Sequence, residues 1–221
     1  MRNIIKIFVN EDFGNKEKIP SAYLQQINYL KKLWDTPSYG LERVFRLFVC
    51  SLQFLFPLIL IREIFGRFGS SARKLAVEFY TLFKVIFPIY ILFSGLYHNK
   101  LFIFILIYLL METIFHILNL IFLSQIHSLV ISYHRSLLLI FLHYIEVVLD
   151  YANIYIAFDL LNRELSPISA LYFTLVANTT VGFGDICPKD GLGQIVVMSQ
   201  LGIGVLFVFL FINYFFQRQE E

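Results

Sequence analysis

Long apolar runs separated by short polar stretches dominate the sequence. A transmembrane helix needs about 20 mostly apolar residues to cross roughly 30 Å of hydrocarbon. Four runs reach that length: Phe79–Tyr97, Leu101–Leu123, Leu137–Leu160 and Leu192–Phe216. The pattern therefore predicts four membrane-spanning helices.

A fifth apolar run, Leu47–Ile61, is shorter and interrupted. As a helix it would cover only about 22 Å. It contains Gln53 and Pro57 and has Arg46 and Arg62 at its two ends. Two interpretations stay open: the run lies in the interface or re-enters the membrane, or the two arginines snorkel and the run spans it.

The composition excludes a soluble globular protein. Hydrophobic residues make up 58% of the 221 residues, charged residues only 15%, and the chain holds 25 Phe and 13 Tyr. A net charge of +2 is too small to indicate nucleic-acid binding. Cys50 and Cys187 match neither a disulfide framework nor a zinc site. No catalytic motif is present, so we expect neither enzymatic activity nor a cofactor.

The distribution of Lys and Arg predicts the topology. Arg62, Arg67, Arg73 and Lys74 precede the run that starts at Phe79 and place that end in the cytoplasm. The link 161–191 is then external and the C-terminus is cytoplasmic. We also expect residues 1–40 to form a polar cytoplasmic segment and residues 41–135 to hold the N-terminal membrane helices.

The external link contains a short helix and a glycine-containing return. Ser166 is a suitable N-cap and Pro167 a suitable first helical residue. A helix over 167–178 has about three turns and is too short to cross, so the chain must dip into the membrane and return. Alternate glycines in the return segment, 180–184, permit positive φ values. Irregular backbone at membrane depth is tolerated where it lines a water-filled path.

Here the sequence resembles the pore region of potassium channels. Thr-Thr-Val-Gly-Phe-Gly-Asp at 179–185 matches the selectivity-filter signature of that family, with Phe183 where Tyr is commoner. The resemblance covers roughly residues 136–216. It implies an all-α membrane protein with an outer helix, a re-entrant pore helix, a filter and an inner helix, preceded by further membrane helices. Residues 136–221 would then form the pore domain.

The resemblance also implies a function for the return segment. The backbone carbonyls of Thr180, Val181, Gly182 and Phe183, with the Thr180 hydroxyl, would bind K⁺, and Gly184 would complete the filter. K⁺ would be the permeant ion, with no other metal. Because one chain has one such loop, four copies would form a homotetramer in the cell membrane. The alternative is an accessory or uptake-transporter subunit of a K⁺ transport system.

Some residues around the filter depart from the family pattern. Val176 stands where many bacterial members have a Glu that braces the filter Asp, so Asp185 would depend on the Tyr172 hydroxyl. Phe183 would pack against the pore-helix aromatic Phe173. Thr179, just before the filter, is a further supporting residue.

Three other features invite hypotheses. Gly202 and Gly204 in the last apolar run are candidates for a gating hinge or for close helix packing. Cys187 either faces the external mouth or fills a space behind the filter. Ionisable residues near the middle of the membrane could form a metal site, a pH-sensitive network or a structural polar cluster. These are Lys84, Glu112, His116, His143, Glu146 and Asp150.

Overall fold

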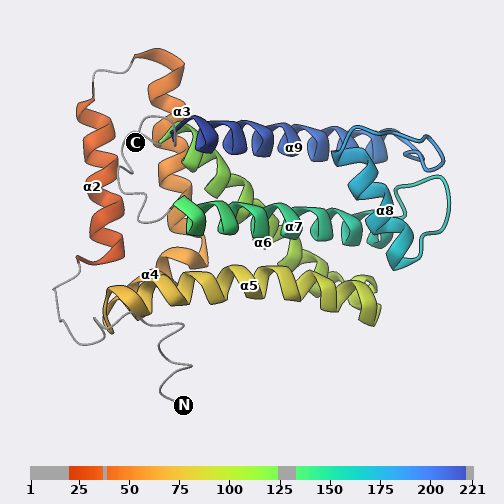
Figure 1. Ribbon diagram of the computed structural model, residues 1–221, viewed down its shortest axis with the longest axis horizontal. Coiled ribbons are helices and arrows are strands. Elements are labelled where there is room, and N and C mark those ends of the chain that lie inside the picture. The colour runs from red at the N-terminus through yellow and green to blue at the C-terminus, as the bar shows by residue number, and fades with distance from the viewer. Residues whose placement is uncertain (1–19, 37–38, 124–132, 218–221) are drawn as a thin grey trace. The chain divides into compact units, whose positions relative to one another are not determined.

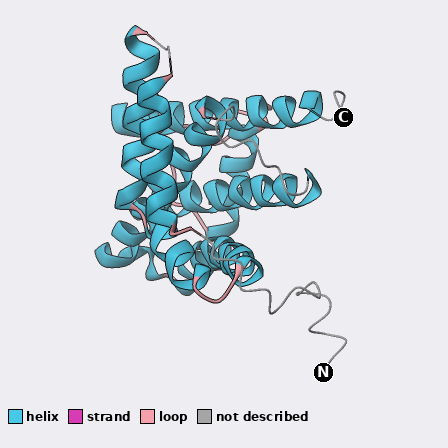
Figure 2. Cartoon of the chain, turned by 90° about the vertical axis from the view of Figure 1, so that its left-hand side faces the viewer, coloured by secondary structure: helices cyan, strands magenta, loops and turns pink. Residues whose placement is uncertain are grey.

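The computed structural model describes residues 20–36, 39–123 and 133–217. Every regular element in these ranges is a helix (Figure 2), and the isolated bridge Leu161–Pro188 is their one β-type pairing. The predicted all-α fold is therefore confirmed. Much of the expected polar segment 1–40 lies outside the described residues.

Four of the helices are long and apolar enough to cross a membrane. They are α5 (Ser70–Ser94), α6 (Lys100–Phe122), α7 (Tyr133–Ala157) and α9 (Gly191–Gln217). Each of them overlaps one of the four predicted spans. α5 begins well before Phe79, because its helical hydrogen bonding also includes the polar residues that precede the apolar run. It ends where Gly95 adopts a φ of 75°.

The run Leu47–Ile61 does not form one straight helix. It is divided among α3 (Gly40–Leu52), the 3₁₀ turn η1 (Gln53–Leu55) and α4 (Pro57–Gly66), and the two helical arms meet at an angle of 66°. The break falls just before Pro57, which has no amide hydrogen to continue the ladder. A bent pair of this kind fits either a broken span or a re-entrant segment.

Contacts divide the chain into two compact units, Met1–Leu82 with Asn119–Ser128 and Phe83–Leu118 with Leu129–Glu221. In the first unit, α2 (Ala22–Asp35) packs through a core of Leu33, Cys50 and Leu123. The buried Gln26 amide donates to the Cys50 carbonyl at 3.0 Å. Polar bonds at buried positions thus accompany the apolar packing of α2.

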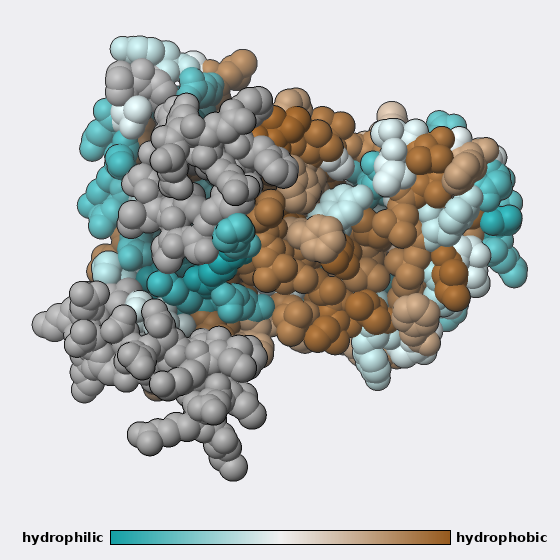
Figure 3. Space-filling model, in the orientation of Figure 1, coloured by the Kyte–Doolittle hydropathy of each residue, from teal (hydrophilic) through white to brown (hydrophobic). Residues whose placement is uncertain are grey.

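The second unit holds the link that the sequence singles out. Its short helix α8 (Pro167–Asn178) lies beside the ends of α7 and α9 (Figure 1). Ala152, Ala170 and Leu92 are fully buried where α7, α8 and α5 meet. Small residues at such positions let helices approach closely. Apolar side chains cover the long helices of this unit, and hydrophilic ones gather at the end that carries α8 and its loops (Figure 3).

Gly193, in the first turn of α9, packs against the backbone that follows α7. A Cβ at this position would lie 2.4 Å from the Leu160 carbonyl oxygen, which already accepts a hydrogen bond from the Lys189 amide at 2.9 Å. The backbone at the start of the link therefore contacts the first turn of α9 here. A side chain added at Gly193 would force these two backbone segments apart.

We predict that Gly193→Ala lowers the stability of the protein by about 1–3 kcal/mol, the usual cost of overpacking. Thermal unfolding in detergent should show a lower melting temperature than the wild type. Gly191→Ala is the matched control, because a Cβ there meets nothing within 4 Å. Equal melting temperatures for the two variants would contradict the close approach at Gly193.

Candidate functional site

The start of α8 is held by the predicted cap. The Ser166 hydroxyl oxygen accepts a hydrogen bond from the Ser169 amide at 3.1 Å, and Pro167 occupies the first turn. Both expectations for the start of this helix are confirmed. Because Ser166 satisfies an amide that the helix itself leaves unpaired, α8 can begin within the link.

The end of α8 has an unusual residue in a common motif. The Val181 amide donates to the Val176 carbonyl at 3.2 Å and the Thr180 amide to the Ala177 carbonyl at 3.1 Å, which is the Schellman pattern. That motif places its C′ residue in the left-handed region, and Thr180 has a φ of 58°. Glycine normally takes this position, and a β-branched residue there is strained.

Positive φ values alternate along the return segment. Thr180, Gly182 and Gly184 have φ of 58°, 57° and 78°, whereas Val181 and Phe183 do not have positive φ. Where a backbone alternates between right- and left-handed conformations, successive peptide groups turn the same way, with the amides on one side and the carbonyls on the other. The alternating positive φ values are those that such a row of carbonyl oxygens requires.

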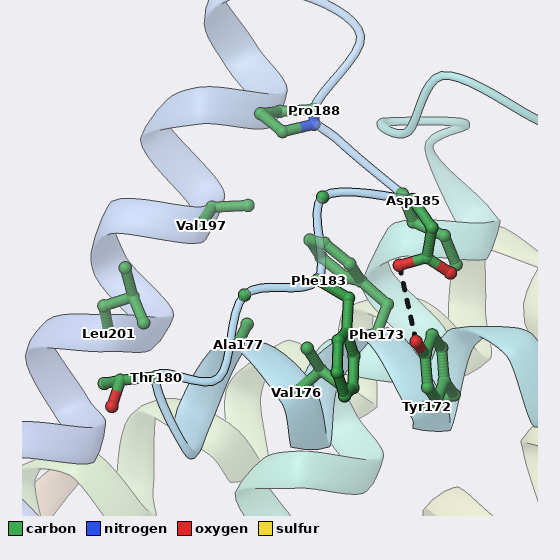
Figure 4. A pocket seen from close by; sticks show the side chains of 13 residues that line it. Tyr172, Phe173, Val176, Ala177, Thr180, Phe183, Asp185, Pro188, Val197 and Leu201 are labelled. Carbon is green, nitrogen blue, oxygen red and sulfur yellow. Dashed lines mark hydrogen bonds between the residues drawn. The ribbon is translucent and has the colours of Figure 1, made fainter.

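The amides of this row lack partners in a single chain. Among the described residues, no hydrogen bond is made by the amides of Gly182, Phe183 and Gly184. Val181 and Phe183 are 55% and 67% exposed. An apolar pocket of about 310 Å³ lies beside the segment, with Val197 and Leu201 of α9 among its lining residues (Figure 4).

The aromatic support of the segment differs from expectation. Phe183 stacks on Tyr172, with ring centroids 6.3 Å apart and an interplanar angle of 1°. Phe173, the expected partner, instead packs edge-on against Tyr155 of α7 at 5.1 Å. Sequence spacing does not decide which of two adjacent α8 rings turns toward the loop within one chain, and the supporting role of Phe173 stays a prediction.

Asp185 has two polar neighbours. The Tyr172 hydroxyl donates to its Oδ1 at 3.4 Å (Figure 4), which is the contact that the sequence suggested, and it is long for a hydrogen bond. The Arg163 guanidinium lies 4.0 Å from its Oδ2. Sequence reasoning missed Arg163, whose one signal is a positive charge at the start of the link. Both contacts are exposed and hold Asp185 weakly.

The two ends of the link are joined beside this site. The Asn162 side-chain oxygen accepts a hydrogen bond from the Cys187 backbone amide at 3.2 Å, and the Asn162 backbone amide donates to the Cys187 carbonyl at 2.9 Å. Lys189 forms an ion pair with Asp159, and this charged hydrogen bond raises the pKa of the Lys189 ammonium group. These residues, also missed from the sequence, fix the base of the loop. Thr179 bonds back to the Leu175 carbonyl at 2.8 Å.

Cys187 is a free, exposed thiol in the isolated chain. Its Sγ lies 3.4 Å from the carbonyl oxygen of Gly184, the last residue of the return segment. Of the two interpretations of Cys187, the exposed position favours an accessible thiol over a buried spacer.

The two α9 glycines have different surroundings. A Cβ on Gly204 would lie 3.3 Å from the Asn178 Oδ1, whereas one on Gly202 would meet nothing within 4 Å. α9 is a continuous helix through both positions. Close packing therefore accounts for Gly204, and a hinge at either glycine stays a hypothesis.

Most of the predicted mid-membrane ionisable residues come together in the second unit. The buried Lys84 ammonium lies 3.0 Å from the Glu146 Oε1 and 3.4 Å from the Glu112 Oε2. Thr113, which sequence reasoning missed, accepts a hydrogen bond from Lys84 and donates to Glu146 at 2.8 Å. The His143 Nδ1 is 2.8 Å from the other Glu146 oxygen.

The two remaining members lie at the edge of this cluster. The His116 ring is 5.5 Å from the His143 ring. Asp150 follows Glu146 by one turn and is 2% exposed, and its Oδ2 has no hydrogen-bond partner among the residues that the structure describes. The described residues contain no group of three His, Cys, Asp or Glu side chains placed to hold a metal ion.

The carboxyl groups of the cluster are buried beside a positive charge. Glu112, Glu146 and Asp150 are each at most 3% exposed, and the Glu112 and Glu146 carboxylates lie within 3.4 Å of the Lys84 ammonium. An uncompensated charge in such surroundings costs several kcal/mol, so a change of protonation within the cluster would disturb its packing. A pH-sensitive network and a structural polar cluster both stay hypotheses for these residues.

Comparison with known proteins finds a family match for the C-terminal part of the chain. Residues 143–221, which include α8, the return segment and α9, match a family model described as ion channel. No curated protein matches the chain, and no solved structure matches it. Together with its apolar helices, this match identifies a multi-pass membrane protein with an ion channel domain.

We predict that the mid-membrane cluster makes the ion current sensitive to pH between about 5 and 8, where histidine titrates. His143 contacts Glu146 on α7 and lies 5.5 Å from the His116 ring on α6, and Glu146 in turn pairs with Lys84 on α5, which also faces Glu112 on α6. Open probability recorded in planar bilayers should change over this range, and the double substitution His116→Gln with His143→Gln should remove the change. His98→Gln, at the η2 turn (Leu96–His98) outside the cluster, is the control. The same pH response in the double variant would leave the cluster with a structural role.

A second prediction concerns Cys187. If its thiol faces the external mouth, micromolar cadmium on that side should inhibit the current, because thiolates bind soft metals. Cys187→Ser should abolish the inhibition. Cys50→Ser is the control, since Cys50 is buried in the first unit. A wild-type current that ignores both cadmium and thiol reagents would contradict this placement.

Proposed function

We propose that this chain, whose residues 143–221 belong to the ion channel family, forms a homotetrameric, potassium-selective channel that conducts K⁺ passively across the cell membrane. The observation that carries the proposal is the alternation of positive φ at Thr180, Gly182 and Gly184, which would align the carbonyl oxygens in one row. Such rows replace the hydration shell of a permeating K⁺.

The geometry of ion coordination argues for four chains. One row of carbonyls can approach an ion from one side only, so an ion held by backbone oxygens needs further rows around it. The described chain contains one such segment. Four copies related by rotation about the ion path would complete each ring of oxygens from Thr180, Val181, Gly182 and Phe183, and the Thr180 hydroxyl would add a further ligand.

The exposed surface of the second unit is consistent with assembly. The unpaired amides of the return segment need partners once they lie at membrane depth, and lipid offers none. Only 22% of the most apolar part of α9 is buried within the chain. Neighbouring copies would cover part of this helix and the Val181 and Phe183 side chains, and lipid would cover the rest.

The orientation follows from the positive charges of the first unit. Arg62, Arg67, Arg73 and Lys74 lie in or near the turn between α4 and α5 and favour the cytoplasmic side. With four spans in order, α8 and its return segment then open to the outside and the C-terminus is cytoplasmic. Cys187 and Asp185 would line the external mouth.

Reconstitution into liposomes separates this proposal from its alternative. A channel loads rubidium or potassium passively and shows unitary currents in bilayers. An uptake-transporter subunit would give flux without unitary currents, and an accessory subunit would give no flux alone.

We predict that Gly182→Ala abolishes selective K⁺ current, because an alanine at a φ of 57° is strained by about 1–2 kcal/mol in each of four copies and would displace the carbonyls. Gly191→Ala is the control, because Gly191 has neither a positive φ nor an atom within 4 Å of its would-be Cβ. The measurement is the K⁺ over Na⁺ permeability ratio in bilayers, with assembly checked by size-exclusion chromatography. Selective K⁺ current in Gly182→Ala at the wild-type level would overturn the assignment of the filter.

A further inference from the structure

A fully buried glutamine lies in the apolar helix α9. Gln200 has an exposed fraction of 0%. Its Oε1 accepts a hydrogen bond from the Tyr155 hydroxyl at 2.6 Å. Its Nε2 donates to the Thr174 carbonyl at 2.9 Å and to the Asn178 Oδ1 at 3.0 Å. The two amide hydrogens are therefore both used, and one side chain joins α7, α8 and α9.

The two acceptors on α8 lie where that helix turns into the return segment. Thr174 is one turn before Asn178, and Asn178 is the last residue of α8. Thr180, the first proposed ion ligand, follows two residues later. The Schellman bonds hold this turn from within the loop, and Gln200 holds the same helical turn from α9.

Gly204 makes room for this contact. It follows Gln200 by four residues, so the two lie on the same face of α9. A Cβ at Gly204 would lie 3.3 Å from the same Asn178 oxygen that accepts the Gln200 bond. The absence of a side chain at Gly204 thus lets the Asn178 amide lie against α9.

We propose that Gln200 is a positioning residue of the filter, which fixes the end of α8, and through it Thr180, relative to the inner helix. The inference rests on the proposed potassium channel function. Gln200 does not itself touch the ion. It acts through Asn178 and Thr174, and a change in the position of α9 would reach the first carbonyls of the filter through the same bonds.

A neighbouring contact provides the matched control. The Tyr151 hydroxyl lies 2.9 Å from the Ser199 hydroxyl and joins α7 to α9 one turn away from the Tyr155–Gln200 bond. This contact does not include α8. Loss of an α7–α9 hydrogen bond alone is therefore tested by Tyr151→Phe, and loss of the connection to α8 by Gln200→Leu.

The experiment measures the K⁺ over Na⁺ permeability ratio from the reversal potential in reconstituted bilayers, because this ratio does not depend on how much protein folds. Gln200→Leu is nearly isosteric and removes both bonds to α8, and it should lower the ratio by about tenfold. Asn178→Ala removes one of the two bonds and should lower it less. The combined variant should be no worse than Gln200→Leu alone, because both substitutions break one network. Tyr151→Phe should keep the wild-type ratio.

The outcomes distinguish the proposal from the function on which it rests. A wild-type channel without K⁺ selectivity would overturn both. A selective wild type with an unchanged ratio in Gln200→Leu and Asn178→Ala would overturn the role of Gln200 alone. If Gln200→Leu fails to assemble, Asn178→Ala decides: a lowered ratio supports the proposal, and a wild-type ratio overturns it.

Discussion

The structure depends on the need of every backbone polar group at membrane depth for a partner. α8 has twelve residues and spans about 18 Å, so in the proposed channel the chain would turn back inside the membrane and leave the helix there. The amides of residues 182–184 and the carbonyls of residues 180–183 would then depend on ions, water or other chains for partners. The Ser166 cap, the Schellman turn and the buried bonds of Gln200 all serve to hold the chain on either side of this unpaired segment.

This constraint also accounts for the strain at Thr180. A left-handed residue with a Cβ costs about 1–2 kcal/mol, and the glycines at 182 and 184 avoid that cost. Thr180 adopts the conformation because two backbone hydrogen bonds close the end of α8 around it. Threonine at this position also places a hydroxyl group near the Thr180 carbonyl, and a glycine would have no such group. Strain of this kind at a proposed ligand is typical of functional sites.

α7 carries two buried polar networks on different faces. Glu146 faces Lys84 of α5 and Thr113 of α6, whereas Tyr151 and Tyr155 face Ser199 and Gln200 of α9. In hydrocarbon such groups select one packing arrangement, because sliding or rotating the helix would leave them unpaired. α7 is thereby placed in register with α5 and α6 before it and with α9 after it.

The helical class, the four long helices, the cap at Ser166 and the filter candidates could all be predicted from the sequence. Length, hydropathy and glycine spacing are local properties, and they act through helix geometry and backbone sterics. The residues that hold the candidate filter could not be found in this way. The ring partner of Phe183, the Arg163 contact to Asp185, Thr113 within the charged cluster and the Gln200–Asn178 bond join positions between 11 and 33 residues apart. A lone glutamine in an apolar run has no periodic signal of its own. Tertiary packing alone decided its role, because it brought α7 and α8 to the one face of α9 where both ends of that amide find partners.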